Sequence, residues 1–453
     1  MISPEIIDDA VKIIMKGYSQ YEYFFSQLKS AAWIRPLMDR DFFKKPAGKE
    51  LHDSGEYWAR WPESKYLARV AASGAQDVVA AFQEMPKTDN PLIHADIVEA
   101  ALKIPVEMAA SLSKIEREWL KTQSYVSLFA QDYGTLISHL AKGGETTEAL
   151  EFARTLLDII PDPRFVDADV DSDTDDGFGF ASSPRPKPRL RDWYDIVLEN
   201  NMPDLVLAAD IESVKLFSNL LAKAIMLSHR DPLSLQPNDY LEIQLPNLEE
   251  IDEVSRRDTR VLLAKNLLKA VEQTISKEIG NLTQILEILE FHNWTIFTRI
   301  ALHSLSRIAD SAPVVCKRYL LDPNQFHKHG INSEYFHLLQ NSLESMSEDE
   351  MDTVFSWIQN GPLEISDFMS NGEEERERYV KSWKCRRYHV CRSKLFGHFK
   401  DEYKRLHDDL GPEGTATFQR PSNSIHTRFG PLSPCTVEEL CDHTNTELIE
   451  YLS

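Results

Sequence analysis

Glycine, cysteine and basic residues are all scarce in this chain of 453 residues. Its 17 glycines leave little material for the backbone loops that cradle phosphate groups. Its five cysteines are too few, and odd in number, for a disulfide framework, which indicates reduced thiols in a cytoplasmic protein. Basic residues number 50 against 72 acidic ones, a net charge of −22. Because such a surface repels phosphate backbones and anionic lipids, general nucleic-acid and membrane binding are disfavoured.

Long apolar runs and catalytic motifs are missing as well. No uninterrupted apolar segment approaches the roughly 20 residues that span a bilayer. The N-terminal run MISPEIIDDAVKII lacks the basic start and apolar centre of a signal peptide. The sequence contains no GxxxxGK[ST], GxGxxG, HExxH or GxSxG motif. We therefore predict a protein that is not an enzyme, needs no cofactor and does not bind a membrane.

Apolar residues recur at helical spacing in almost every ordered segment. Ser3-Pro4 and Asn90-Pro91 each place a capping side chain before a proline, which predicts a helix start. Ser347-x-x-Glu350 is a capping box, and Gly361-Pro362 marks the end of the helix behind it. The apolar residues from Leu205 to Ile225 predict one long helix.

Strand patterns, by contrast, are few. Asp239 to Leu245 alternates briefly, but one short run does not make a sheet. The run LISHLAKGGETTEALEFARTLLDII places small residues at a turn between two helices, like a tetratricopeptide (TPR) hairpin. Short helices on either side of EFHNW are typical of HEAT-like pairs. Helix pairs with short links predict an all-α fold, arranged as an irregular α-solenoid or helical-repeat array.

An acidic stretch interrupts this pattern: six of the ten residues from Asp167 to Asp176 are aspartate. A calcium-binding EF-hand loop starting at Asp171 would need glycine at position 6 and glutamate at position 12. The glycine comes one residue late, at Gly177, and position 12 is Ser182. The prolines that follow favour extended backbone. The stretch is therefore predicted to be a solvated, flexible insertion rather than a calcium site.

These features divide the chain into four predicted parts. An N-terminal helical-repeat block covers residues 1–160, and an acidic, proline-rich flexible linker covers 161–190. A HEAT-like block follows at 191–362, and a C-terminal helical segment at 363–453. Because the sequence stops two turns into a freshly capped helix, the C-terminal segment is expected to continue into a longer protein.

The main local contrast in this acidic chain is the basic stretch KSWKCRRYHVCRSK, Lys381 to Lys394. Cations interleaved with aromatic rings are typical of contacts with single-stranded nucleic acid, since cations pair with phosphates while rings stack on bases. Another interpretation is a helix whose aromatic residues pack inward while its basic chains lie on an acidic neighbour. The candidate residues for contact with a polyanion or a partner are Lys384, Arg386, Arg387 and Arg392.

Four cysteines, with two nearby histidines, raise the question of a metal site. Cys385-x3-His389-x-Cys391 and Cys435-x5-Cys441-x-His443 together offer thiolate and imidazole donors for zinc. The C-x5-C spacing differs from the usual zinc knuckle, and ordinary cysteines explain the same pattern. We therefore assign no metal ligand from sequence.

Several phrases resemble the N-terminal region of large, mostly uncharacterised bacterial α-helical repeat proteins of the HEAT and TPR kind. They are WIRPLMDRDFF, WPESKYLARVA, TDNPLIHADIVEAAL, RIALHSL and FGPLSPCTVEEL. The resemblance spans most of the chain and brings no catalytic residue. It implies helical repeats, and it associates such chains with scaffold or sensor roles in phage defence.

The sequence thus predicts a non-enzymatic scaffold that binds a protein partner along a helical-repeat surface. The net charge favours a partner with a basic or mixed face. An alternative is the sensor or regulatory half of a larger bacterial effector whose catalytic domain lies outside this chain. In that case the stretch from Lys381 to Lys394 would contact nucleic acid or the effector domain.

Overall fold

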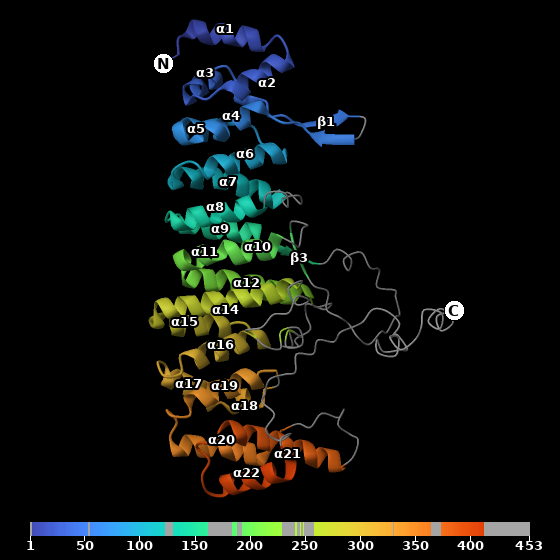
Figure 1. Ribbon diagram of the computed structural model, residues 1–453, viewed down its shortest axis with the longest axis vertical. Coiled ribbons are helices and arrows are strands. Elements are labelled where there is room, and N and C mark those ends of the chain that lie inside the picture. Colours follow the sequence, from blue (N-terminus) through green and yellow to red (C-terminus); the bar gives the residue numbers. More distant parts are fainter. Residues whose placement is uncertain are drawn as a thin grey trace, which may run out of the picture. The chain divides into compact units, whose positions relative to one another are not determined.

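The computed structural model describes residues 2–52, 55–122, 130–161, 184–187, 193–228, 258–328, 330–363 and 373–411, with the single residues 241, 245 and 248. The chain divides into two compact units, Met1–Phe418 and Gln419–Ser453, and every described residue lies in the first. Most of these residues are helical, which confirms the predicted all-α class (Figure 1). None of the helices in these ranges has the length and apolar character needed to cross a membrane.

The helices of the N-terminal part begin where the sequence signals predict. The Ser3 side chain caps the first helix, and the Asn90 side chain accepts from Leu92 N at 3.0 Å at the start of another. The helices of this part are α1 (Pro4–Ile14), α2 (Tyr18–Gln27), α3 (Ile34–Met38), α4 (Pro62–Val70), α5 (Ala75–Glu84), α6 (Pro91–Ala101), α7 (Val106–Thr122), α8 (Ala130–Lys142) and α9 (Thr146–Leu156).

One later helix also matches its predicted cap. Ser347 and Glu350 form the predicted capping box, and that helix ends at Gly361, whose φ of 85° favours glycine. The helices of this part are α10 (Tyr194–Asn200), α11 (Met202–Ala209), α12 (Ile211–Ser228), α14 (Thr259–Lys277), α15 (Leu282–Glu290), α16 (Thr295–Arg307), α17 (Pro313–Leu320), α18 (Pro323–His327), α19 (Asn332–Ser342), α20 (Glu348–Asn360), α21 (Glu373–Val390) and α22 (Gly397–Leu410).

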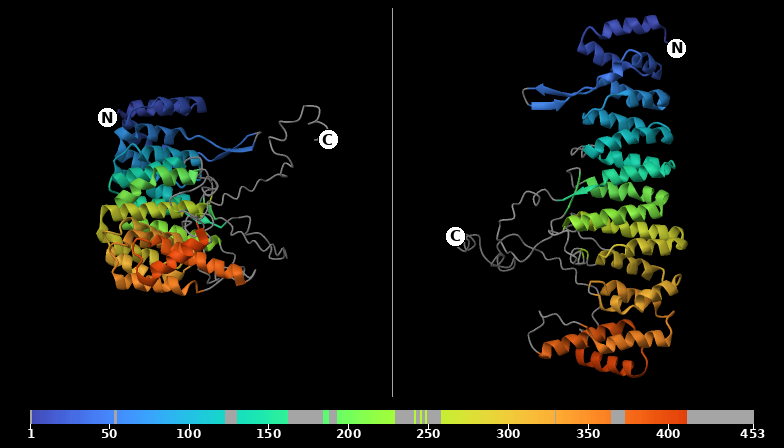
Figure 2. Two further views of the ribbon diagram at one scale, coloured as in Figure 1. Left: turned by 60° about the horizontal axis from the view of Figure 1, so that its bottom comes forward. Right: turned by 180° about the vertical axis from the view of Figure 1, so that it is seen from behind.

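Each helix packs mainly on helices close to it in the sequence. In the first part α4 contacts α6, α6 contacts α7, and α7 contacts α9. Later α12 packs on α14, α16 on α19, α19 on α21, and α21 on α22. Figures 1 and 2 show the helices of this unit following one another in chain order. Every helix therefore buries its apolar face against local partners.

The turn between α8 and α9 confirms the predicted helix-turn-helix. Gly144 adopts a φ of 93°, where a side chain would be strained. A Cβ on Gly143 would lie 2.4 Å from Cγ2 of Val106, so this backbone approaches α7 too closely for any side chain. The two small residues are thus required for different reasons.

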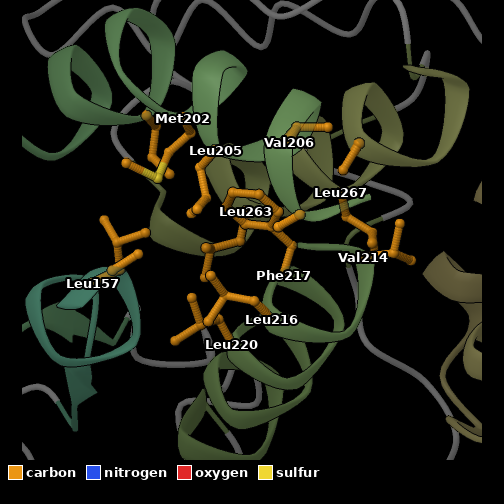
Figure 3. Packing of buried hydrophobic residues seen from close by; sticks show 14 of the residues in the cluster. Leu157, Met202, Leu205, Val206, Val214, Leu216, Phe217, Leu220, Leu263 and Leu267 are labelled. Atoms are coloured by element: carbon orange, nitrogen blue, oxygen red, sulfur yellow. The ribbon is translucent and has the colours of Figure 1, made fainter. Parts of the chain in front are cut away.

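The apolar core continues from one helix pair to the next. Figure 3 shows Phe217 of α12 and Leu263 of α14 among the side chains packed between these helices, with Leu205 of α11 nearby. All three are fully buried. Burial of a leucine or phenylalanine contributes about 1.5–3 kcal/mol each, so this packing dominates the local stability.

The single helix predicted from Leu205 to Ile225 is wrong: the chain breaks at Asp210 between α11 and α12. Asp210 has a φ of 43°, and its carboxylate pairs with Lys277 of α14 at 2.7 Å. The apolar periodicity runs through the break without interruption, because residues on both sides face the same core. Periodicity alone therefore does not reveal this turn.

A β-hairpin not predicted from sequence joins the helices near residue 50. Strands β1 (Lys49–His52) and β2 (Gly55–Trp58) pair antiparallel and project away from the helices (Figure 1). The pair is held by Tyr57 donating to Glu50 at 2.6 Å and by the Lys49–Glu56 ion pair at 3.0 Å. Neither face of this hairpin is buried, so its strands lack alternating apolar residues. Strand prediction from sequence depends on that alternation and therefore missed the hairpin.

Most of the predicted linker 161–190, including the acidic stretch Asp167 to Asp176, lies outside the described residues. Its described part contains a short strand. Strand β4 (Arg185–Pro186) pairs antiparallel with β3 (Ile159–Ile160), and Lys187 N donates to the Asp158 carbonyl at 2.8 Å. Extended, proline-rich backbone can thus supply hydrogen bonds to a neighbouring strand at an edge. The Asp239 to Leu245 run is described only at Leu241 and Leu245.

A buried ion pair connects α16 to α19. The Arg299 guanidinium donates to Glu334 Oε1 from Nε at 2.8 Å, and Nη2 lies 2.7 Å from the same oxygen. Arg299 Nη1 also donates to the Leu245 carbonyl at 2.8 Å. Both side chains are almost fully buried, so each charge depends on the other for its stability.

We expect Glu334→Ala to lower the free energy of unfolding by about 3–5 kcal/mol, because it leaves the buried Arg299 cation without its carboxylate. The matched control is Asp77→Ala, which breaks the exposed Arg35–Asp77 pair of 2.7 Å and should cost less than about 1 kcal/mol. Urea unfolding followed by circular dichroism measures both. Equal costs would show that the Arg299–Glu334 pair does not stabilise this part of the fold.

Candidate functional site

The basic stretch Lys381 to Lys394 lies on α21 and the turn that follows it. Its lysines are paired with acidic neighbours: Lys381 lies 3.2 Å from Asp409 and Lys384 lies 3.3 Å from Glu402, both carboxylates on α22. Lys394 pairs with a glutamate that follows α19, at 2.8 Å. This arrangement corresponds to the interpretation in which basic chains lie on an acidic neighbour.

The four candidate contact residues do not form one surface. Lys384 is half-buried against Glu402, and Arg392 lies in the exposed turn, where it donates to the His389 carbonyl at 3.2 Å. Arg386 is exposed and Arg387 is buried. The structure brings only Arg386 and Arg387 together, in the wall of one cavity.

Arg387 is held in place by aromatic and polar neighbours. Its guanidinium carbon lies 3.6 Å from the centre of the Trp383 ring and 5.0 Å from that of Phe336. Nη2 donates to Asn332 Oδ1 at 3.0 Å, and Nη1 donates to the Trp383 carbonyl at 3.3 Å. Burial, with a further contribution from Arg386, lowers the pKa of Arg387 to about 9. The group remains a cation at neutral pH, fixed in one orientation.

This cavity, called here the C-terminal cavity, has a volume of about 470 Å³. It lies between α18, the start of α19, the segment that follows α20 and one face of α21. The α21 residues in its wall form adjacent pairs that recur after three or four residues, which places them on one side of the helix. The main side chains of the lining are Phe326, Lys328, Tyr379, Trp383, Arg386 and Arg387.

The charges of the C-terminal cavity are of one sign. Lys328, Arg386 and Arg387 are cations, and the described lining residues include no aspartate or glutamate. Burial and the nearby Arg387 lower the pKa of His327, so this imidazole is neutral at pH 7. A cation-lined hollow with aromatic walls can bind an anion, and this is the strongest chemical feature of the described chain.

Cys385 and Cys391 are buried free thiols, and burial raises the pKa of each. Without a metal ion beside them, both thiols are protonated at neutral pH. Cys435, Cys441 and His443 lie outside the described residues. Within the ranges that the structure describes, no three histidine, cysteine or acidic side chains are placed to hold a metal ion.

A buried His–Glu–Tyr cluster joins α6, α7 and α8. His94 Nδ1 lies 2.8 Å from Glu116 Oε1, and Tyr133 donates to Glu116 Oε2 at 2.7 Å. The other imidazole nitrogen contacts the Thr88 carbonyl at 2.9 Å, and Trp119 stacks on the ring. Although burial opposes it, the Glu116 carboxylate raises the pKa of His94. All of these groups are enclosed, so the cluster stabilises the fold and cannot reach a substrate.

A second cavity, of about 410 Å³, lies between α2, α4 and α6. Its charges are mixed and largely engaged: Lys65 pairs with Asp96 at 3.3 Å, and Arg69 donates to the Phe25 carbonyl at 2.8 Å. Beside it, Glu63 is buried and accepts a hydrogen bond from Tyr21. Burial raises the pKa of Glu63 to about 7, against the opposing effect of the Tyr21 hydrogen bond.

Sequence reasoning missed Phe326, Lys328 and Asn332 of the C-terminal cavity. They come from α18, the residue after it and the start of α19, and they meet α21 only through tertiary packing. The alternation of cations and aromatics from Lys381 to Lys394 identified the α21 wall. Nothing in the sequence identified the opposite wall.

The raised pKa of Glu63 predicts a pH-dependent stability. A carboxyl group whose pKa is higher in the folded state stabilises the fold below its unfolded pKa, and this contribution is lost as pH rises towards 7. We expect wild type to lose about 3 kcal/mol of this contribution between about pH 4.5 and 7. Glu63→Gln should remove that slope. Unfolding midpoints across this range test it, and parallel curves for the two proteins would contradict it.

Comparison with known proteins gives no relative: no family model, no curated protein and no solved structure matches the chain.

Proposed function

We propose that this chain is a non-enzymatic scaffold that binds a protein partner along an irregular α-solenoid of HEAT- and TPR-like helix pairs. Helices that pack on near neighbours in chain order support this arrangement. Such an array offers side chains of successive helices on a continuous, semi-rigid surface. The net charge of −22 favours a partner with a basic or mixed face.

The observation that carries the proposal is Phe291, whose side chain is 82% exposed at the end of α15. Aromatic side chains are enriched among the residues that contribute most to the affinity of protein interfaces. Beside it is a hollow of about 330 Å³, here called the α12–α15 hollow. Its lining residues are Lys215, Asn219, Gln284, Glu287, Ile288, Phe291 and His292.

The α12–α15 hollow fits a protein side chain better than a small ligand. It carries charges of both signs, from Lys215 and Glu287, and the exposed aromatic ring of Phe291. His292 forms a fixed wall, because its ring stacks on Phe297 with centres 4.5 Å apart. Apolar contact at the centre with a polar rim is the usual composition of a non-obligate interface.

The alternative function is the sensor or regulatory half of a larger bacterial effector. The resemblance to bacterial repeat proteins associates such an effector with phage defence. The C-terminal cavity favours this reading, because a sensor needs a site for a small ligand. Reading the coding sequence beyond Ser453 separates the two functions. A catalytic domain in the same frame supports the sensor, and a stop codon supports the scaffold.

We expect Phe291→Ala to weaken partner binding without changing the stability of the fold. The matched control is Val314→Ala on α17. Its side chain is 81% exposed, close to the value for Phe291, but it lies outside the α12–α15 hollow. Proteins that co-purify with the full chain and its two variants are quantified by mass spectrometry. The partner is then purified, and its affinity for each chain is measured by calorimetry.

The partner should bind wild type and Val314→Ala equally, and Phe291→Ala about 30-fold more weakly, as for an interface hot spot. Equal affinity for all three chains would place the interface elsewhere on the protein. If no protein binds wild type in the purified system, the scaffold function is wrong.

A further inference from the structure

The C-terminal cavity is an unusual electrostatic feature in a chain with a net charge of −22. Three of its lining side chains are cations, and none of the described ones is an acid. The lysines on the other faces of α21 are neutralised by carboxylates of nearby helices. Among the described residues, no carboxylate of the cavity lining neutralises Arg386, its exposed cation.

Arg387 supplies a preorganised cation in this cavity. Stacking on Trp383 at 3.6 Å and the hydrogen bond to Asn332 fix the plane of its guanidinium. Because the side chain is almost fully buried, its desolvation and ordering accompany folding and are not repeated when a ligand binds. An anion that enters the cavity meets a cation already in position.

Arg386 supplies a second cation of a different kind. It is the next residue on α21, lies in the same cavity wall and is exposed to solvent. Within the described part of the chain it forms no ion pair, whereas Lys384 on the same helix is paired with Glu402. Two adjacent guanidinium groups present several N–H donors, which suits the three oxygens of a phosphate group better than a single carboxylate.

Three aromatic side chains, Phe326, Tyr379 and Trp383, also line the cavity. Phe326 and Trp383 lie edge to face with their ring centres 5.9 Å apart, and Tyr379 lies one turn before Trp383 on α21. The cavity volume of about 470 Å³ is within the usual range of about 300–1,000 Å³ for small-molecule sites. A ligand of this size can carry both a planar ring and a phosphate.

We propose that the C-terminal cavity binds a nucleoside phosphate, with its phosphate paired to Arg386 and Arg387 and its base against the aromatic wall. Lys328, which also lines the cavity and donates to Thr298 Oγ1 at 3.1 Å, adds a third positive charge to the lining. This site is independent of the protein-binding function proposed for the α12–α15 hollow. The inference concerns a mononucleotide and not a nucleic-acid strand. Glu402 and Asp409 of α22 neutralise Lys384 and Lys381, so these lysines give no extended basic surface for a long phosphate backbone.

The test is calorimetric titration of the full chain with ADP, GDP, UDP and CDP in separate experiments. Adenosine and inorganic phosphate are titrated as fragments, and a thymidine oligonucleotide represents single-stranded nucleic acid. We expect at least one nucleotide to bind, more tightly than either fragment and more tightly than the oligonucleotide. Binding should weaken as salt increases, because the phosphate contact is ionic.

The decisive variant is Arg386→Gln, since an exposed side chain can be changed without loss of the fold. It should weaken nucleotide binding by roughly tenfold or more, and Lys328→Gln should also weaken it. The matched control, Arg392→Gln, removes an exposed arginine six residues further along, outside the cavity lining, and should leave affinity unchanged. Circular dichroism confirms that each variant is folded.

Four results would overturn the proposal. They are no binding by any of the four nucleotides at millimolar concentration, binding of phosphate or adenosine as tight as that of the nucleotide, preference for the oligonucleotide, and equal effects of the Arg386 and Arg392 substitutions. The third result would instead support the single-stranded nucleic-acid contact considered from sequence. None of them depends on whether a protein binds at Phe291.

Discussion

Apolar contact between neighbouring helices is the interaction on which the rest of this structure depends. Phe217 of α12 packs with Leu263 of α14, and equivalent contacts continue from one pair of helices to the next (Figure 3). Because the main contacts connect helices that are close in sequence, the stability of each part depends on its immediate neighbours. A core substitution in one pair of helices should therefore destabilise mainly the adjacent helices.

This dependence gives buried polar groups a particular role. Arg299 with Glu334, and His94 with Glu116, each connect two helices that also pack through apolar side chains. Apolar packing alone tolerates small shifts between helices, whereas a buried charge pair has one favourable geometry. Such pairs fix the register of adjacent helices, and the enclosed position of His94 explains why this cluster is structural despite its acid–base groups.

The sequence predicted the features that depend on local chemistry. The capping box of Ser347 and the turn at Gly144 were readable because short-range hydrogen bonding and backbone strain determine them. The break at Asp210 and the hairpin at Lys49–Trp58 were not, since tertiary contact fixes the first and neither face of the second is buried. Helical class was therefore predictable, and exact element boundaries were predictable only where a cap was present.

The candidate site also has features that the sequence predicted and features that depend on tertiary contact. Cations and aromatics on α21 form a pattern within one helix, so the sequence identified them, but it treated Lys384, Arg386, Arg387 and Arg392 as equivalent. Their differences arise from neighbours that are distant in the sequence: Glu402 neutralises Lys384, and the α18–α19 region encloses Arg387.

Charge composition also suggested that anions would be repelled. Salt screens charges over a Debye length of about 8 Å. The repulsion therefore holds for a ligand longer than this, because such a ligand lies close to many acidic groups of the surface. A small anion inside the cavity is instead closest to two guanidinium groups, so an acidic protein can select against polyanions and still bind a mononucleotide.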